Sequence, residues 1–395
     1  MSVRKRKWKT SRGEPREAWI VDYVDQNGGR HIETFERKKD ADSFHASVTV
    51  DVSKGIHTPK SKSITVAQAA EDWLAFVRRE QRETSTLRQY ENHVRHINKY
   101  AGRLTLAKLT MPAVEKIRDR LLEDLSRPMA RKVLVSFKSI IREARRRGNI
   151  AHNVADGVKI TISKRDKKKL QIGVDIPTTD EIARMMRSVQ GRSRAFLAAA
   201  AFSGLRASEL RGLRWSDINW TGSAIGVSQK VDAWGEIGAT KSSSSNRSVP
   251  VWSHLLQILK EWRLEAGMPA DDALVFADQD GKPEPYDVQR KVFDDAQIAA
   301  SIVAPAVDRH GEPVTGRDGK QLSGPKYSGL HALRHYFASL CINRKEDGGL
   351  GLDPKDVQER MGHSTIVLTY DVYGHLFPRK SDGSEFTALE KAILG

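Results

Sequence analysis

Near its C-terminus the chain reads Met361-Gly-His-Ser-Thr-Ile-Val-Leu-Thr-Tyr-Asp-Val-Tyr-Gly-His-Leu376. It places His363 and Tyr373 ten residues apart within a polar helical pattern. Two earlier stretches add two arginines and two further histidines: Ser203-Gly-Leu-Arg-Ala-Ser-Glu-Leu210 and Leu330-His-Ala-Leu-Arg-His-Tyr336. Together the three stretches supply the cationic and nucleophilic side chains that a metal-free phosphodiester exchange needs.

Length and composition indicate a multidomain protein. At roughly 150 residues per domain, 395 residues predict two or three domains. No apolar run approaches the roughly 20 residues of a membrane span, and the basic start of the chain is not followed by the apolar segment of a secretory signal. The single cysteine, Cys341, lies in an apolar helical pattern, so we expect a buried packing residue rather than a catalytic thiol. These features favour a cytoplasmic protein without a membrane partner.

The positive charge of the chain is concentrated in its first part. The formal net charge is +16. Residues 66–169 hold 25 Lys/Arg against 12 Asp/Glu, residues 1–65 hold 14 against 9, and residues 170–395 hold 27 against 29. A nearly neutral domain with basic attachments is typical of proteins on a polyanion, because each neutralised phosphate releases counterions. The distribution favours nucleic acid as the partner over a membrane surface or an acidic protein.

A small sheet followed by a helix is predicted for residues 1–57. Residues 17–24 and 31–35 alternate and are rich in β-formers, and a turn signal at residues 27–29 separates them. A helical pattern then runs over residues 38–52. Because about 55 residues give only a marginal core, we expect this domain to depend on DNA or on a neighbouring domain for stability.

Residues 65–163 are predicted to form a compact, basic four-helix domain, joined to the first by a linker at residues 57–63. Its helical patterns start at Thr65, at Thr84 or Ser85, at Met111-Pro112 and at Met129. The fourth helix ends at Arg147 in a cluster of arginines, where cations suit the helix dipole. These arginines could serve solubility alone, but the net charge of the domain favours contact with a nucleic-acid backbone.

Residues 174–395 are predicted to form a mixed α/β domain that is mostly helical, reached through a basic linker at residues 164–169. We expect Thr179 to cap its first helix, and a second helix over residues 195–202. Strands are predicted at residues 224–231 and 247–251, and a loop or hairpin insertion at 305–328. Further helices are expected at about 254–266, 287–300, 331–344, 353–360 and 366–376.

Two pairs of residues at helical spacing carry the candidate chemistry. Glu209 lies three residues after Arg206 and could hold its guanidinium in place. His331 and Arg334 are also three residues apart, so they project to one side of a helix. For either helix alone, a surface ion pair or a lone His-x-x-Arg is the simpler interpretation. Two guanidinium groups that meet at one phosphate would neutralise its oxygens and stabilise a pentacoordinate transition state.

Four groups of residues, in their order and spacing, closely resemble the motifs of the tyrosine recombinases, the phage integrase family. They are Gly204-Leu-Arg-x-x-Glu-Leu210, Lys241 with the later Arg247-Ser-Val-Pro250, His331-x-Leu-Arg-His335, and Gly362-His363 with the later Tyr373. The resemblance is close from about residue 176 to 380. Upstream, the four-helix and the sheet–helix regions resemble the core-site-binding and arm-site-binding domains of larger integrases at the level of pattern only.

The resemblance implies six catalytic residues: Arg206, Lys241, His331, Arg334, His363 and Tyr373. Tyr373 would attack the scissile phosphate, form a 3′-phosphotyrosyl link and release a 5′-hydroxyl. The two arginines would clamp the phosphate and His363 would hydrogen-bond to it. Lys241 would protonate the leaving oxygen, and His331 would exchange a proton with Tyr373. A phenol with a pKa near 10 needs a basic pocket or a base for this attack.

Alternatives remain at two of these positions. Tyr370 also lies near His363, but the family places its nucleophile one turn later, which selects Tyr373. Lys230 is a rival to Lys241, because the serine run at residues 242–245 leaves the hairpin register open. We expect His335 and His375 to be supporting residues rather than catalytic ones.

By resemblance, the protein is a site-specific DNA recombinase that integrates, and in reverse excises, a phage or other mobile element. Its fold would be multidomain and mainly α, with small β elements. Its partners would be double-stranded DNA at attachment sites, three further copies in a homo-tetramer, and an accessory DNA-bending or directionality protein in a bacterial cell. Strand exchange is nearly balanced in energy, so no cofactor or metal ion is expected. The alternatives are a catalytically silent DNA-binding relative, which would lack a motif residue, and a relaxing type IB topoisomerase.

Overall fold

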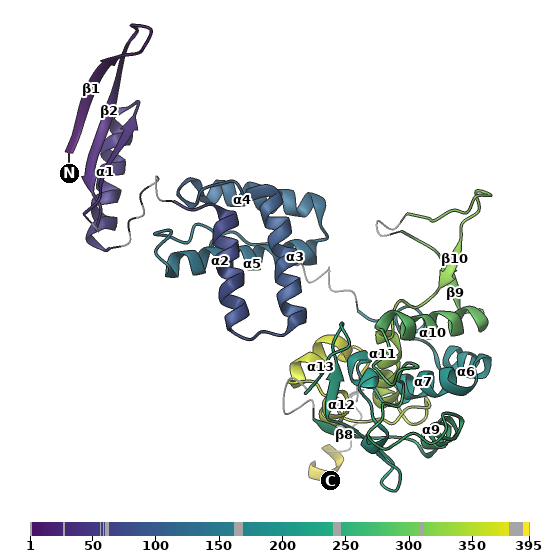
Figure 1. Cartoon of the computed structure of the whole chain (residues 1–395). Helices are drawn as coiled ribbons and strands as arrows, with labels where there is room; N and C mark the ends of the chain where they lie inside the picture. Colours follow the sequence, from purple (N-terminus) through teal and green to yellow (C-terminus); the bar gives the residue numbers. More distant parts are fainter. Residues whose placement is uncertain are drawn as a thin grey trace. The chain divides into compact units, whose positions relative to one another are not determined.

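The chain forms two compact units, Met1–Lys167 and Lys168–Gly395. The structure is a computed structural model, and it describes residues 2–26, 28–55, 57, 59, 63–161, 169–239, 246–308, 312–378 and 390–394. Figure 1 shows the elements of each unit, which are mainly helices with small antiparallel sheets, as the sequence predicts. Most of both predicted linkers lies outside the described residues. No described helix is both long and apolar enough to cross a bilayer.

The first unit begins with a three-stranded antiparallel sheet that is covered on one face by a helix. Strands β1 (Ser2–Lys9), β2 (Pro15–Val24) and β3 (Arg30–Phe35) lie in that order, and α1 (Lys38–Ser53) follows. The sequence missed β1, because its run of basic residues lacks the apolar alternation of a half-buried strand. Ion pairs with β2 support it instead, including Lys5 with Glu17 at 2.8 Å.

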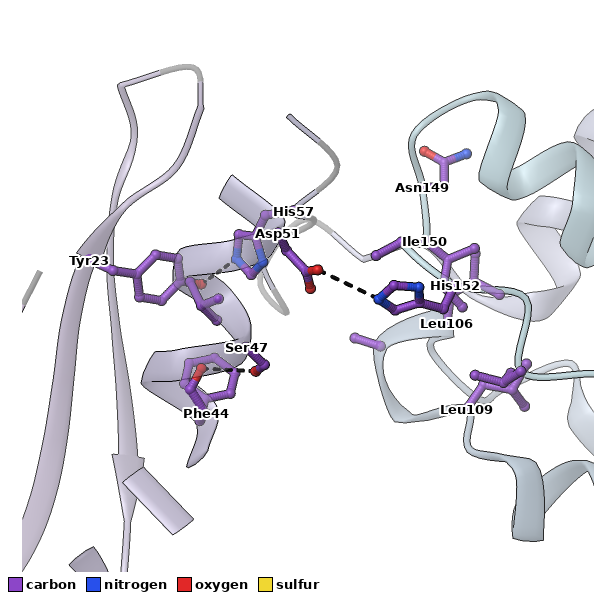
Figure 2. Close-up of a pocket in the computed structure, with 14 residues that line it drawn as sticks. Tyr23, Phe44, Ser47, Asp51, His57, Leu106, Leu109, Asn149, Ile150 and His152 are labelled. Carbon is purple, nitrogen blue, oxygen red and sulfur yellow. Dashed lines mark hydrogen bonds and ion pairs between the residues drawn. The ribbon is translucent and has the colours of Figure 1, made fainter. Parts of the chain in front are cut away.

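A few large side chains make up the core of this sheet and helix. Tyr23 is fully buried, and its ring lies edge-on to Phe44 of α1. Its phenol oxygen is 2.8 Å from Nε2 of His57. Figure 2 marks this contact with a dashed line. His57, placed by the sequence at the edge of the linker, is therefore part of the core.

Four helices complete the first unit: α2 (Val66–Arg79), α3 (Thr84–Ala101), α4 (Met111–Asp124) and α5 (Arg127–Arg146), with a short 3₁₀ turn η2 (Leu106–Lys108) before α4. Thr65 and Gln68 form a capping box at the start of α2, so the predicted cap is confirmed. Helix α5 begins two residues before the predicted Met129. It buries one apolar face, which includes Phe137 and Ile140, while the arginines at its end remain exposed.

The second unit is built mostly from helices. They are α6 (Thr179–Ser188), α7 (Gly191–Phe202), α8 (Ala207–Arg211), α9 (Ser253–Glu265), α10 (Tyr286–Ala299), α11 (His331–Ile342), α12 (Pro354–Met361) and α13 (Ile366–Tyr373), with a 3₁₀ turn η4 (Trp215–Asp217). The predicted cap of α6 was wrong by one residue. The hydroxyl of Thr178, not of Thr179, accepts a hydrogen bond from the amide of Glu181 at 3.2 Å, and the Glu181 carboxylate accepts one from the amide of Thr178. Helix α13 ends at Tyr373 rather than at the predicted residue 376.

Small antiparallel sheets border these helices. Strands β4 (Ile218–Asn219), β5 (Ala224–Val227) and β8 (Arg247–Pro250) form one sheet, and β6 (Gln229–Val231) pairs with β7 (Ile237–Ala239). The single strand predicted over 224–231 is thus two strands, separated at Ser228, whose hydroxyl bonds to Asp217 at 3.1 Å. The predicted insertion contains a hairpin of β9 (Val303–Pro305) and β10 (Ser323–Pro325).

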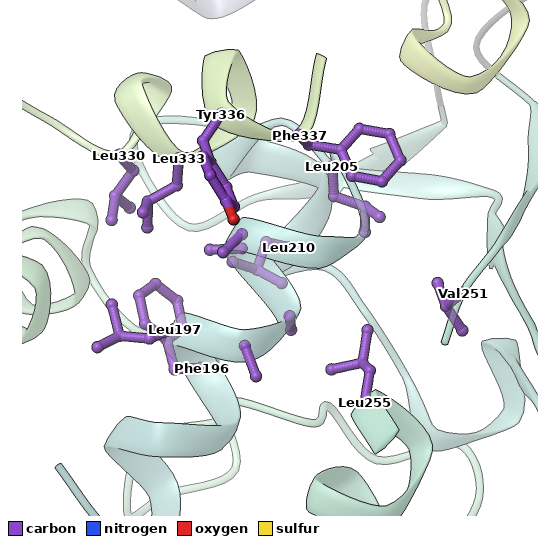
Figure 3. Close-up of a cluster of buried hydrophobic side chains, with 14 of the residues drawn as sticks. Phe196, Leu197, Leu205, Leu210, Val251, Leu255, Leu330, Leu333, Tyr336 and Phe337 are labelled. Atoms are coloured by element: carbon purple, nitrogen blue, oxygen red, sulfur yellow. The ribbon is translucent and has the colours of Figure 1, made fainter. Parts of the chain in front are cut away.

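A hydrophobic core joins the segment around Arg206 to helix α11. Figure 3 shows Leu205 and Leu210 close to Leu333, Tyr336 and Phe337 of α11. Gly204 has φ +63°, and an added Cβ would collide with the Phe337 ring. The backbone before Arg206 can therefore approach α11 closely only because residue 204 is glycine.

Candidate active site

Five of the six predicted catalytic residues are described, and they lie around the last turn of α12. Arg206 precedes α8, His331 and Arg334 belong to α11, His363 follows α12, and Tyr373 ends α13. The sixth, Lys241, lies outside the described residues. Its rival Lys230 lies in β6.

Glu209 anchors one side of the site. Its side chain is 4% exposed, and its oxygens accept hydrogen bonds from Arg206 at 2.7 Å and from Arg247 at 3.0 Å. Burial alone would raise the pKa of Glu209, but the hydrogen bond and charge of Arg247, followed by those of Arg206, hold that pKa below its usual range. The carboxylate therefore stays ionised and fixes both guanidinium groups, as the spacing of Arg206 and Glu209 predicts.

Arg334 is a buried cation whose hydrogen-bond acceptors carry no net charge. It is 3% exposed, and it donates hydrogen bonds to the carbonyl oxygens of Gly204 and Met361. Burial, followed by repulsion from Arg206, lowers its pKa to about 9. Because carbonyl groups carry no net charge, an anion that enters here would gain strongly from the field of these two arginines.

Three consecutive carbonyl groups at the end of α12 accept hydrogen bonds from three arginines. The pairs are Arg247 with Arg360, Arg334 with Met361, and Arg206 with Gly362, at 2.9 Å for the first and 2.7 Å for the last. The carbonyl end of a helix carries partial negative charge, which suits cations. This turn therefore gathers guanidinium groups from three separate elements beside the loop that carries His363.

Tyr373 is buried within this group of cations and imidazoles. It is 1% exposed, and its phenol oxygen lies 2.7 Å from Nδ1 of His335. Its ring stacks on that of His363, with centroids 6.2 Å apart and planes at 10°. Burial raises the pKa of Tyr373 above its ordinary value, although Arg334 opposes this effect. Tyr370, the rival tyrosine, is 53% exposed and packs near Phe377.

The three imidazoles of the site differ in their contacts. The rings of His331 and His335 meet edge-on at 4.6 Å, whereas His363 bonds through Nδ1 to the hydroxyl of Thr369 at 2.9 Å. Burial and neighbouring positive groups lower the pKa of His335 and that of His363 to about 4. Reduced solvation and the charge of Arg334 also lower the pKa of His331. All three imidazoles are therefore neutral at pH 7, so the positive charge contributed by the residues named in this section resides on the arginines.

Two residues make contacts in the site that the sequence did not predict. Arg247 appeared only within a motif, yet it joins Glu209 to α12. The available signal was its place at the start of a short predicted strand. His335 was expected to be a supporting residue, yet it contacts the phenol of Tyr373, while His331 does so only through His335. His375, in contrast, bonds to the backbone carbonyl of Leu170 at 2.7 Å, a supporting contact.

Comparison with known proteins identifies the family of the chain that carries these arginines and the buried tyrosine. The model of the phage integrase family matches residues 177–380, which include all six predicted catalytic positions. The chain belongs to the phage integrase family. Members are tyrosine-type site-specific DNA recombinases, and this family member is accordingly an enzyme of that class.

Relatives and solved structures match this phage integrase family member over most of its length. A "tyrosine recombinase XerC-like" protein of Caldanaerobacter subterraneus subsp. tengcongensis is 25% identical over 376 residues, which is 90% of this chain and 91% of the relative. The Tn1549 transposon integrase in complex with a circular intermediate DNA has a TM-score of 0.60 at 20% identity, covering 84% of this chain and 100% of that one. A lambda integrase tetramer bound to a Holliday junction has a TM-score of 0.56 at 15% identity, covering 91% of this chain and 95% of that one. These two structures share its fold.

Proposed function

We propose that this recombinase cuts and rejoins double-stranded DNA through a covalent 3′-phosphotyrosyl link to Tyr373, and so integrates, and in reverse excises, a phage or other mobile element. The observation that carries the proposal is the convergence of Arg206 and Arg334 beside the buried phenol of Tyr373, although these residues are up to 167 positions apart. Two fixed guanidinium groups beside one nucleophile fit a phosphodiester as the group attacked.

The roles of the described site residues follow from their positions, and the role of Lys241 follows from its place in the motifs. Arg206 and Arg334 bind the non-bridging oxygens, because their other hydrogen bonds already fix their orientation. His363 donates a hydrogen bond to the phosphate, and Lys241 protonates the leaving 5′ oxygen. An alkoxide is a poor leaving group, so an acid at that atom lowers the barrier. Cleavage exchanges one phosphodiester bond for a phosphotyrosyl ester of similar energy. Religation therefore requires no cofactor or metal ion.

The DNA partner and a tetrameric assembly are part of the same proposal. The Tn1549 integrase and the lambda integrase tetramer of the same fold are both bound to DNA. In this chain the excess of basic residues over residues 66–169 would lie against the DNA backbone. We assign core-site binding to residues 65–163, catalysis to residues 174–395 and arm-site binding to residues 1–57. A DNA-bending or directionality protein would act with the tetramer.

The outer face of the N-terminal sheet is the surface proposed for arm sites. Arg4 lies opposite Ile20 and Arg6 opposite Ala18, on the sheet face that α1 does not cover. The double variant Arg4→Glu, Arg6→Glu should lose protection only at outlying sites when the full chain is footprinted on DNA that flanks its own gene. Loss at the core site as well would contradict this division of roles.

The covalent step is tested with a nicked suicide duplex that carries the footprinted core site. The wild-type protein should give a DNA adduct that resists SDS, and Tyr373→Phe should abolish it. Tyr370→Phe is the matched control and should retain the adduct, because Tyr370 lies one turn before Tyr373 on α13 and is 53% exposed. An adduct that survives Tyr373→Phe, or that is lost only in Tyr370→Phe, would refute the proposed nucleophile. No adduct from the wild-type protein would indicate a silent DNA-binding relative.

A further inference from the structure

The nucleophile proposed above has a direct partner that the sequence motifs do not explain. The phenol oxygen of Tyr373 lies 2.7 Å from Nδ1 of His335, within ordinary hydrogen-bond distance. His331, the histidine implied by the motifs for proton exchange with Tyr373, instead meets the ring of His335 edge-on. His331 is at the exposed start of α11, while His335 lies one turn deeper.

The protonation states of the pair favour a phenol that donates to the imidazole. Tyr373 is buried, so its neutral form is favoured and it carries a proton. His335 is neutral as well, and a neutral imidazole has one nitrogen free to accept a hydrogen bond. The lone pair of Nδ1 then points along the O–H bond that must break when the phenol attacks.

Resting on the proposed role of Tyr373, we propose that His335 is a further catalytic residue, which accepts the phenol proton at Nδ1 during strand cleavage. As the Tyr373 oxygen bonds to phosphorus, its O–H bond breaks and the proton passes to Nδ1. The bond between phosphorus and the 5′ oxygen breaks at the same centre, and that oxygen takes a proton from the separate acid. In religation the 5′-hydroxyl displaces Tyr373, and the imidazolium returns its proton to the phenolate.

The charges around His335 control its basicity, and so when it can accept this proton. The groups that face it are His331 and Arg334 of α11, Asp175 before α6, His363 after α12, and Tyr373 itself. In the free protein, burial and the positive neighbours keep the pKa of His335 at about 4, so it is a weak base. A phosphate bound to the arginines would offset their charge and raise this pKa toward neutrality. A base is most effective when its pKa lies near the working pH.

The test separates proton acceptance from simple positioning. His335→Asn keeps an oxygen acceptor close to the position of Nδ1, so it can hold the phenol, but an amide does not take up a proton at neutral pH. The full-length variant is compared with wild type in single-turnover cleavage from pH 5.5 to 9.5. The substrate carries sulfur in place of the bridging 5′ oxygen, so the leaving group needs no acid and the profile reports the nucleophile alone. His331→Asn is the matched control.

We expect His335→Asn to bind DNA within threefold of wild type and to cleave about 100-fold more slowly at pH 7, the lower end of the range for general-base catalysis. Its rate should rise continuously to pH 9.5, whereas the wild-type rate should level off near neutrality. His331→Asn should keep the wild-type inflection. The proposal would be overturned if the pH profile of His335→Asn had the same shape as that of wild type, whatever its absolute rate. It would also be overturned if His331→Asn, and not His335→Asn, lost the inflection. If Tyr373→Phe still formed the adduct, the proposed function itself would fail, a result that is independent of His335.

Discussion

Replacing Glu209 by glutamine tests the electrostatic balance of the site. The change removes the buried carboxylate that holds Arg206 and Arg247, but keeps the size of the side chain. Breaking a buried ion pair by neutralising one partner typically costs about 3–5 kcal/mol, because the other charge stays buried. In a unit of this size 1 kcal/mol corresponds to roughly 2–4 °C, so we expect the melting temperature to fall by about 10 °C.

The assay is calorimetry of the full-length protein, with hydrogen exchange of α8 and α11 used to assign the transition to the second unit. Glu359→Gln is the matched control: Glu359 pairs with Lys355 at 3.2 Å but is 63% exposed, so its loss should cost less than about 1 kcal/mol. Equal shifts for the two variants, or a shift below about 2 °C for Glu209→Gln, would refute the reasoning.

Wild type and Glu209→Gln can also be compared as a function of pH. Since the pKa of Glu209 is lower in the folded protein than its ordinary 4.5, its ionised form contributes stability above pH 4.5. That contribution is lost as the pH falls through the folded pKa. The stability difference between wild type and Glu209→Gln should therefore be constant near neutrality and shrink below pH 4.5. A difference that grows in acid would contradict the assigned direction of the shift.

Three further outcomes are expected. Gly204→Ala should destabilise the second unit by about 2–4 kcal/mol in denaturant titrations, because the new Cβ would meet the ring of Phe337 at a positive φ; a cost below about 1 kcal/mol would contradict this. Arg247→Lys should slow cleavage roughly tenfold or more with DNA affinity within threefold, since one ammonium cannot replace the fork that joins Glu209 to Arg360; an unchanged rate would remove Arg247 from the site. Cleavage of the suicide duplex should proceed at the same rate with and without EDTA. Loss of cleavage in EDTA would show that a metal ion takes part.

The parts of the site that depend on local spacing could be predicted from the sequence. Arg206 and Glu209 are three residues apart at a helix start, so their ion pair follows from helix geometry. Outside the site, the helix start at Thr65 was predicted in the same way, and the structure adds Gln68 as the second member of its capping box. The helices were found because their apolar faces recur at the helical period, and only their ends shifted by a few residues.

The contacts that depend on the tertiary fold could not be predicted. The three carbonyl groups at the end of α12 receive arginines from β8, α11 and the start of α8, and no local pattern shows that these elements meet. The contact of His335 with Tyr373 likewise depends on how α13 packs against α11. Strand β1 was missed because charged pairing, rather than apolar alternation, supports it.

Direct identification of the residue that carries the DNA tests the central claim. The wild-type adduct is digested with nuclease and trypsin, and the peptide from Met361 to Arg379, which holds both Tyr370 and Tyr373, is fragmented by mass spectrometry. The account predicts a 3′-linked nucleotide on Tyr373. A nucleotide on Tyr370, or on a peptide outside this range, would contradict it.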